Sequence, residues 1–139
     1  MRKLFLLLVF ASTFANAQNK DDEQVRKLLL TQSESWNKGD IVGMMQTYWQ
    51  SDSLMFIAKS GITRGWNQTL AAYKRNYPDA KAMGQLSFDN LHVKRLSPLY
   101  YYVVGKYLLK RETGDRSGHF ALLLQKINGR WVIISDHSS

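Results

Sequence analysis

Two kinds of hydrophobic spacing divide the chain into a helical first half and a strand-rich second half. After residue 20, one set of side chains recurs at intervals of three and four residues, the spacing of a buried helix face. These side chains are Val25, Leu28, Leu29, Gln32 and Trp36. Beyond residue 85 the sequence is instead rich in β-branched and aromatic residues, which favour strands.

Three helices are predicted in the first half, over residues 21–36, 41–49 and 66–77. Asp21 and Gln24 have the spacing of a capping box at the start of the first helix. Asp40 directly follows a glycine and is expected to be the N-cap of the second helix. Pro78 ends the third helix because proline cannot continue it.

Six strands are predicted, and their order indicates the fold class. Their ranges are 54–58, 62–64, 86–96, 99–110, 119–126 and 131–136. The first two form a hairpin around Gly61, and Asn128-Gly129 is a strong hairpin signal between the last two. Helix, helix, hairpin, helix and four long strands describe an α+β domain, in which an antiparallel sheet curls around helices on one face. A pocket between the sheet and the helices follows from this arrangement.

The later strands carry apolar residues on both faces. Every position from 131 to 134 is apolar, and Tyr100, Tyr101 and Tyr102 run consecutively. A sheet with helices on one face only does not need apolar residues on the other face. We therefore expect the outer face to be buried in a homodimer.

The N-terminus has the organisation of a cleavable signal peptide over residues 1–17. Arg2 and Lys3 precede an apolar run, and Ala15-Asn16-Ala17 places small residues at −3 and −1 of a cut before Gln18. The apolar run is shorter than the roughly 20 residues that a membrane span needs. We predict an exported protein, periplasmic or secreted, with one domain over residues 18–139 and no membrane anchor after cleavage.

Composition narrows the classes of partner and site. The chain has 19 Lys and Arg against 11 Asp and Glu, but the basic residues are scattered in pairs, so no nucleic-acid partner is predicted. The absence of cysteine excludes disulfides, a thiol nucleophile and a lipid-modified cysteine. The three histidines lack metal-ligand spacing, and no phosphate loop or dinucleotide fingerprint occurs, so neither a metal nor a cofactor is predicted.

Short motifs in a fixed order run along nearly the whole of residues 18–139. They are Trp36-Asn37-Lys38-Gly39-Asp40, Tyr48, Arg64-Gly65, Gly105 and the closing segment from Gly129 to Ser139. Together they resemble the nuclear transport factor 2-like superfamily, and within it the SnoaL-like and ketosteroid isomerase-like group. The resemblance implies a cone-shaped curved sheet wrapped around three N-terminal-half helices, with a mouth that admits a small, mostly apolar organic ligand. It implies no single function, because this fold hosts isomerases, cyclases, dehydratases, hydrolases and association modules.

The ketosteroid isomerase machinery does not map onto this sequence. Its chemistry needs a carboxylate base and an oxyanion hole made of a phenol and a protonated acid. Counting from the Gly39-Asp40 corner, the phenol's position falls on Gln32, and the base falls near Ile57 or Ala58, which cannot take a proton. The strand from 120 to 124 carries no carboxylate for the acid. We therefore do not expect steroid-type isomerisation by this mechanism.

His137 is the candidate catalytic residue. The resemblance implies a histidine of the final strand near the pocket base, and an imidazole titrates near working pH. Asp136 is not expected to orient it unless the end of the chain is irregular, because successive strand residues point to opposite faces. The sequence does not decide which face Asp136 occupies. The alternative is that His137 only hydrogen-bonds the backbone or caps the sheet.

Five further residues are candidate ligand contacts: Trp36, Tyr48, Arg64, Tyr73 and Tyr107. The aromatic side chains suit a ring-bearing ligand, and the guanidinium suits a ligand carboxylate. The alternatives are that the tryptophan only fills the core and that the arginine forms a structural ion pair or is simply solvated.

Two functions stay open from the sequence. One is an exported small-molecule-binding domain, with or without turnover. Turnover would be proton transfer of the isomerase, dehydratase or cyclase type, with His137 as base and Arg64 or Tyr48 stabilising the developing anion. The other is a non-catalytic dimerisation module whose pocket is filled by side chains.

Overall fold

The fold is given by a computed structural model, which describes the backbone of residues 2–139 and the side chains of residues 16–139. The helices are α1 (Arg2–Asn37), α2 (Ile41–Met45), α3 (Trp66–Asn76) and α4 (Ala80–Met83). The strands are β1 (Met55–Ala58), β2 (Gly61–Arg64), β3 (Gln85–Ser97), β4 (Tyr100–Lys110), β5 (Arg116–Ile127) and β6 (Arg130–Ser138). The predicted α+β class is confirmed, as is the order of the predicted elements. Helix α4 was not predicted; it is a single turn, and the Asp79 carboxylate at its N-terminus accepts a hydrogen bond from the Ala82 N–H at 2.8 Å.

Helix α1 begins before Asp21, so the predicted capping box at that residue is wrong. Because the preceding residues continue the helix, the N–H groups just after Asp21 bond to carbonyls one turn earlier and need no cap. The predicted signal peptide, residues 1–17, lies mostly outside the residues whose side chains are described. Within the described residues, no helix combines the length and the apolar character that a membrane crossing needs.

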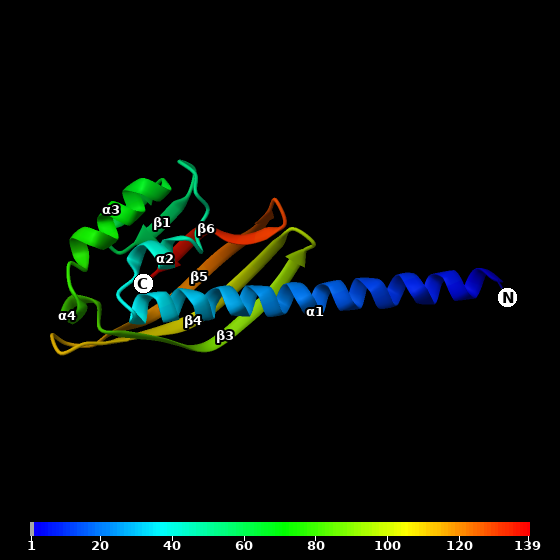
Figure 1. Cartoon of the computed structure of the whole chain (residues 1–139), viewed down its shortest axis with the longest axis horizontal. Helices are drawn as coiled ribbons and strands as arrows, with labels where there is room; N and C mark the ends of the chain where they lie inside the picture. Colours follow the sequence, from blue (N-terminus) through cyan, green and yellow to red (C-terminus); the bar gives the residue numbers. More distant parts are fainter. Residues whose placement is uncertain (1) are drawn as a thin grey trace.

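The predicted face of α1 is buried against the concave side of the sheet, which Figure 1 shows lying behind the helix. Val25, Leu29 and Trp36 are each at most 4% exposed. The corner after the helix also forms as predicted, since the Asp40 carboxylate accepts a hydrogen bond from the Gly43 N–H at 2.7 Å. Local spacing and capping therefore place the two N-terminal helices.

A polar clamp fastens α1 to the sheet at Asp21. Its carboxylate accepts hydrogen bonds from Lys126 Nζ at 2.9 Å and from Trp131 Nε1 at 3.1 Å. Burial raises the pKa of Asp21, but these two hydrogen bonds, together with the positive charges of Lys126 and Arg95, outweigh it and leave the pKa below its ordinary value. One residue on, Asp22 accepts a hydrogen bond from the buried Tyr101 hydroxyl.

The six strands form one sheet in the order β2-β1-β6-β5-β4-β3. Neighbouring strands are antiparallel except β1 and β6, which run parallel, so the predicted all-antiparallel sheet is wrong at this pair. The cause is the connection: β2, α3 and α4 lead the chain from one edge of the sheet to β3 at the other. The meander from β3 then brings β6 back beside β1 in the same direction (Figure 1).

A β-bulge in β6 decides which of its residues face the helices. Ile133 pairs with Leu124 and Ser135 pairs with Leu123, so Ile134 is an extra residue with no partner of its own. Beyond the bulge, Asp136 pairs with Leu122, whose side chain is on the inner face. Strict alternation from Ile133 would have turned Ser135 and His137 inward, whereas the bulge turns Asp136 and Ser138 inward.

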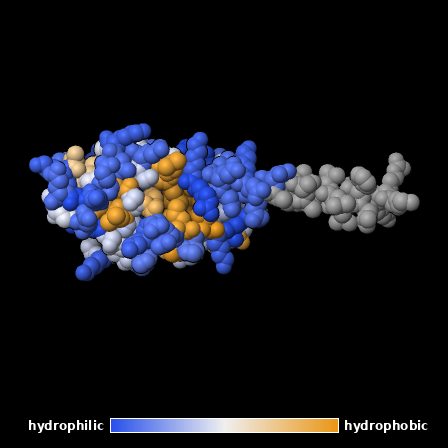
Figure 2. All heavy atoms as spheres, turned by 90° about the horizontal axis from the view of Figure 1, so that it is seen from below, coloured by the Kyte–Doolittle hydropathy of each residue, from blue (hydrophilic) through white to orange (hydrophobic). Residues whose placement is uncertain are grey.

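Some apolar side chains remain at the surface. Those of residues 16–139 that are 40–56% exposed are Leu30, Val42, Ile62, Leu96, Leu99, Tyr102 and Leu108. Figure 2 shows one face of the molecule, on which hydrophobic residues gather near the middle of the domain among hydrophilic ones. The fold therefore leaves apolar surface that its own helices do not cover.

Replacing Asp21 with alanine is expected to destabilise the fold by about 2 kcal/mol, because the buried Trp131 N–H and the Lys126 ammonium lose their shared acceptor. Urea unfolding followed by circular dichroism measures the change. Glu23→Ala, an exposed acidic residue of the same helix, is the control and should change the free energy of unfolding by less than about 0.5 kcal/mol. Equal effects of the two substitutions would contradict the clamp.

Candidate functional site

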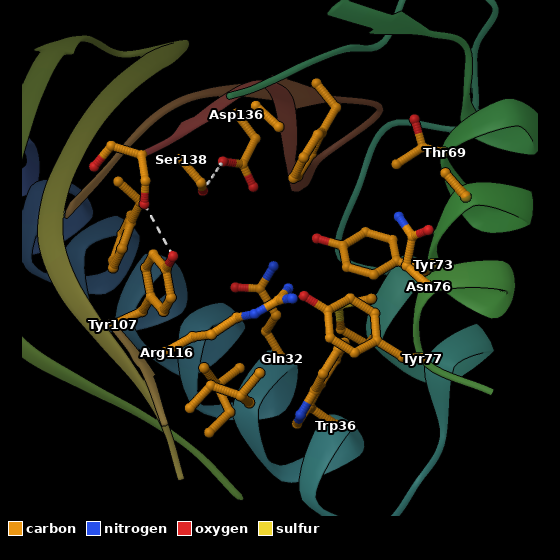
Figure 3. Close-up of a pocket in the computed structure, with 18 of the residues that line it drawn as sticks. Gln32, Trp36, Thr69, Tyr73, Asn76, Tyr77, Tyr107, Arg116, Asp136 and Ser138 are labelled. Atoms are coloured by element: carbon orange, nitrogen blue, oxygen red, sulfur yellow. Dashed lines mark hydrogen bonds between the residues drawn. The ribbon is translucent and has the colours of Figure 1, made fainter. Parts of the chain in front are cut away.

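A cavity of about 890 Å³ lies between the concave face of the sheet and helices α1 and α3 (Figure 3). Ligand pockets commonly have volumes of about 300 to 1,000 Å³, so a small organic molecule fits. The structure thus contains the pocket that the order of elements predicts, and side chains do not fill it.

One wall of the cavity is a set of aromatic rings in edge-to-face contact. The ring centroids of Trp36 and Tyr77 are 4.8 Å apart, and those of Trp36 and Tyr73 are 5.9 Å apart. Phe56 of β1 meets the Tyr73 ring at 5.6 Å. Trp36 Nε1 donates a hydrogen bond to the Met83 carbonyl at 3.1 Å, which fixes the ring. Such a wall suits a flat or ring-bearing molecule.

The polar floor of the cavity is centred on Asp136 of β6, which is 4% exposed. Tyr48 donates a hydrogen bond from its hydroxyl to Asp136 Oδ2 at 2.6 Å, and Ser138 donates to Oδ1 at 2.9 Å, drawn as a dashed line in Figure 3. Gln32 of α1 donates from Nε2 to the Tyr48 oxygen at 3.0 Å. Among residues 16–139 no Lys or Arg forms an ion pair with Asp136, so neutral donors hold its carboxylate.

Burial raises the pKa of Asp136 to about 6, even though the hydrogen bonds from Tyr48 and Ser138 oppose the rise. Burial and the neighbouring Asp136 charge raise the pKa of Tyr48 well above its ordinary value, so its hydroxyl stays protonated. The pKa of Tyr73, whose hydroxyl points into the cavity in Figure 3, is raised by the same two causes. A carboxylate that titrates near neutral pH beside protonated phenols is suited to moving a proton.

His137, the predicted catalytic base, lies on the outer face of the sheet and is exposed. It pairs with Ala121, whereas the inward positions beside it belong to Asp136 and Ser138. The prediction that His137 faces the pocket is therefore corrected. The physical reason is the Ile134 bulge, which shifts the alternation of β6 by one residue.

The other predicted ligand contacts divide into two groups. Those that line the cavity are Trp36, Tyr48, Tyr73 and Tyr107. Tyr107 also donates a hydrogen bond from its hydroxyl to the Ser139 carbonyl at 2.9 Å. Arg64 is exposed on β2, outside the lining, with Nη1 at 3.9 Å from Met55 Sδ, so its predicted place in the pocket is corrected as well.

Several polar residues of the cavity were not among the predicted contacts, and they include Gln32, Asp136 and Arg116. A glutamine within an otherwise apolar helix stripe was a usable signal for Gln32. Arg116 lies between the predicted strands 99–110 and 119–126, but β5 begins at this residue, and alternation counted back from Phe120 turns it inward. In the part of the chain with described side chains, no three His, Asp or Glu residues lie close enough to hold a metal ion.

No family model and no curated protein matches the chain, whereas solved structures do. A nuclear transport factor 2-like protein of unknown function from Shewanella oneidensis MR-1 is 46% identical, with a TM-score of 0.80 over 87% of this chain and 98% of its own. A protein of unknown function with a cystatin-like fold from Nostoc punctiforme PCC 73102 is 16% identical, with a TM-score of 0.67 over 85% and 89%. A proposed scytalone dehydratase from Novosphingobium aromaticivorans DSM 12444 is 11% identical, with a TM-score of 0.70 over 89% and 86%. The last two likenesses show the fold alone.

Asp136→Asn is expected to stabilise the protein by about 1 to 3 kcal/mol above pH 6, because the wild type must ionise a buried carboxyl there. The folded-state pKa of about 6 lies above the ordinary value of 3.8, so the folded state binds more protons between these values. Wild-type stability should therefore fall as pH rises from about 4 to 6, and this fall should be absent in Asp136→Asn. Urea unfolding across this pH range measures both effects.

Asp52→Asn, a change at an exposed aspartate outside the cavity, is the matched control for Asp136→Asn. It should leave the free energy of unfolding within about 0.5 kcal/mol of the wild type at each pH. An Asp136→Asn protein that is less stable than the wild type above pH 6, with the same pH dependence, would show that burial does not raise the pKa of Asp136.

Proposed function

The chain belongs to the nuclear transport factor 2-like family, and from this premise we propose that it binds a small, ring-bearing organic molecule and moves a proton on it. The observation that supports the proposal is a carboxyl that is 4% exposed, has a pKa of about 6 and lies at the floor of a cavity of about 890 Å³. Removal of residues 1–17 and action in the periplasm or outside the cell are part of the proposal.

Asp136 acts as the base in this proposal. At neutral pH a carboxyl with a pKa of about 6 is mostly ionised, and its protonated form readily returns the proton. Tyr48 and Ser138 hold the two carboxylate oxygens, and each oxygen keeps a lone pair for the substrate. The proton passes from an acidic C–H beside a carbonyl to the carboxylate, and the C–H electron pair moves onto the carbonyl oxygen as an enolate.

The negative charge that develops on the carbonyl oxygen needs a hydrogen-bond donor. Tyr73 suits this role, because its hydroxyl points into the cavity and its raised pKa keeps it protonated. Isomerisation, dehydration and ring closure all begin with such a proton abstraction. The site therefore supports the reaction class predicted from the sequence, with Asp136 in the place assigned there to His137.

Hydrogen–deuterium exchange into 2-tetralone and 2-indanone, two cyclic ketones with acidic C–H groups, tests the proposal. Proton NMR in heavy water should show that the wild type accelerates exchange. The exchange rate should increase with pH, with a midpoint near pH 6, and then become constant. Asp136→Asn should lower this rate by at least about 100-fold, because the base is lost.

His137→Ala is the matched control, since it changes the neighbouring residue of the same strand on the opposite face. It should exchange at the wild-type rate. Equal exchange by the wild type and Asp136→Asn, or loss of exchange in His137→Ala alone, would overturn the assignment of Asp136.

The outer face of the sheet favours a second, compatible function, which is self-association. Tyr102 and Leu108 are 40% and 41% exposed on the outer side of β4, with Val104 and Lys106 between them. Leu123 of β5 lies opposite Tyr102 and continues the apolar surface. We propose that a second copy of the chain covers this face, which gives a homodimer.

The double substitution Tyr102→Glu and Leu108→Glu is expected to convert a dimer into a monomer, because the proposed interface would then bury two unpaired charges. Sedimentation velocity at micromolar concentration measures the change, and circular dichroism checks the fold. Leu30→Glu, at an exposed apolar residue of α1, is the control and should leave the dimer intact. A monomeric wild type would contradict the proposed dimer.

A further inference from the structure

Arg116 brings a positive charge into the cavity from the side of the sheet. It is the first residue of β5 and pairs with Leu109 of β4, whose side chain is buried on the inner face. Along β5 it has the same parity as Phe120 and Leu122, which also face inward. Figure 3 shows its guanidinium pointing into the cavity, into which Tyr73 and Tyr77 project from the other side.

The Arg116 guanidinium has no partner among the described residues, whereas nearby charged groups do. Asp115 is occupied in its own loop, where its carboxylate accepts a hydrogen bond from the Arg111 N–H at 3.0 Å. Arg111 donates from Nε to the Gly114 carbonyl at 2.8 Å and from Nη1 to the Ala82 carbonyl at 3.3 Å. Arg111 is therefore structural, while Arg116 is available to a molecule in the cavity.

We propose that the molecule bound in this cavity is an organic anion, a ring-bearing carboxylate, and that Arg116 binds its carboxylate group. The inference rests on the proposed function and names its class of substrate. A guanidinium matches a carboxylate in bidentate fashion, and Lys59 and Asn76 line the same cavity as further donors. This is the role that the sequence suggested for Arg64, carried out by a residue of another strand.

The charges in the cavity also determine the orientation of such a molecule. Asp136 is held by neutral donors and repels a second carboxylate at the floor. The anionic group is therefore directed toward Arg116, which leaves the ring against Trp36 and Tyr73 and the other end of the molecule at Asp136. Without Arg2 and Lys3 of the proposed signal peptide, 17 Lys and Arg remain against 11 Asp and Glu, and this net charge of +6 attracts anions to the protein before they bind.

Binding of 2-naphthoate and 2-naphthamide, which share a shape and differ in charge, tests this inference. In NMR titrations the wild type should bind 2-naphthoate about tenfold more tightly than 2-naphthamide, and Arg116→Gln should abolish this preference. Lys27→Gln removes the same charge from an exposed position of α1 outside the cavity lining and should retain the preference. Circular dichroism checks that each variant is folded.

Three results would overturn the inference: no preference in the wild type, an undiminished preference in Arg116→Gln, or an equal loss in Lys27→Gln, which would indicate a general charge effect. Failure to bind either probe would overturn it too. Hydrogen–deuterium exchange into the neutral ketone 2-tetralone by the wild type distinguishes a failure of the anion site from a failure of the proposed proton transfer. Exchange without a carboxylate preference refutes only the anion site, and an Arg116-dependent preference without exchange refutes only the proton transfer.

Discussion

The hydrogen bond from Tyr48 to Asp136 joins parts of the chain that are far apart in the sequence. Gln32 of α1 donates to the same Tyr48 hydroxyl, so helix, connecting segment and final strand meet at one point. Beside it, residues 47–49 exchange backbone hydrogen bonds with Ile133 at 2.9 and 3.0 Å. A carboxylate that is 4% exposed needs such donors to remain charged. The packing of the helices on β6 and the chemistry of the cavity therefore depend on the same contact.

Features encoded by neighbouring residues could be predicted from the sequence, and features set by distant contacts could not. The buried face of α1, the Asp40 cap and the turns at Gly61 and Asn128-Gly129 are local, and each forms as its residues indicate. The parallel pairing of β1 with β6 depends on where the chain crosses the sheet, which no local pattern reports. The predicted start of α1 was wrong because helical residues precede Asp21, whose carboxylate is therefore free to bond across to the sheet.

The same division applies to the site. Its aromatic residues could be predicted because Trp36 and Tyr73 follow the spacing of a helix, and both lie on helices in the structure. His137 was placed at the pocket by resemblance, and the sequence did not decide which face Asp136 occupies, because a bulge changes strand parity without leaving a residue signature of its own. The cavity therefore carries opposite charges at two places. One is a buried carboxylate held by neutral donors, and the other is an arginine without a protein partner among the described residues.

The Ile134 bulge also bears on how the chains of relatives should be aligned. Because Ile134 has no partner on β5, a protein that lacks one residue between Ile133 and Asp136 can pair regularly and still present its carboxylate to the cavity. In an alignment such a protein would show a gap just before the functional aspartate. An ungapped alignment anchored on the apolar run would instead match that aspartate to Ser135. Length variation at this point is therefore compatible with an unchanged site, and the aspartate is better located by its pairing with Leu122 than by its distance from Trp131.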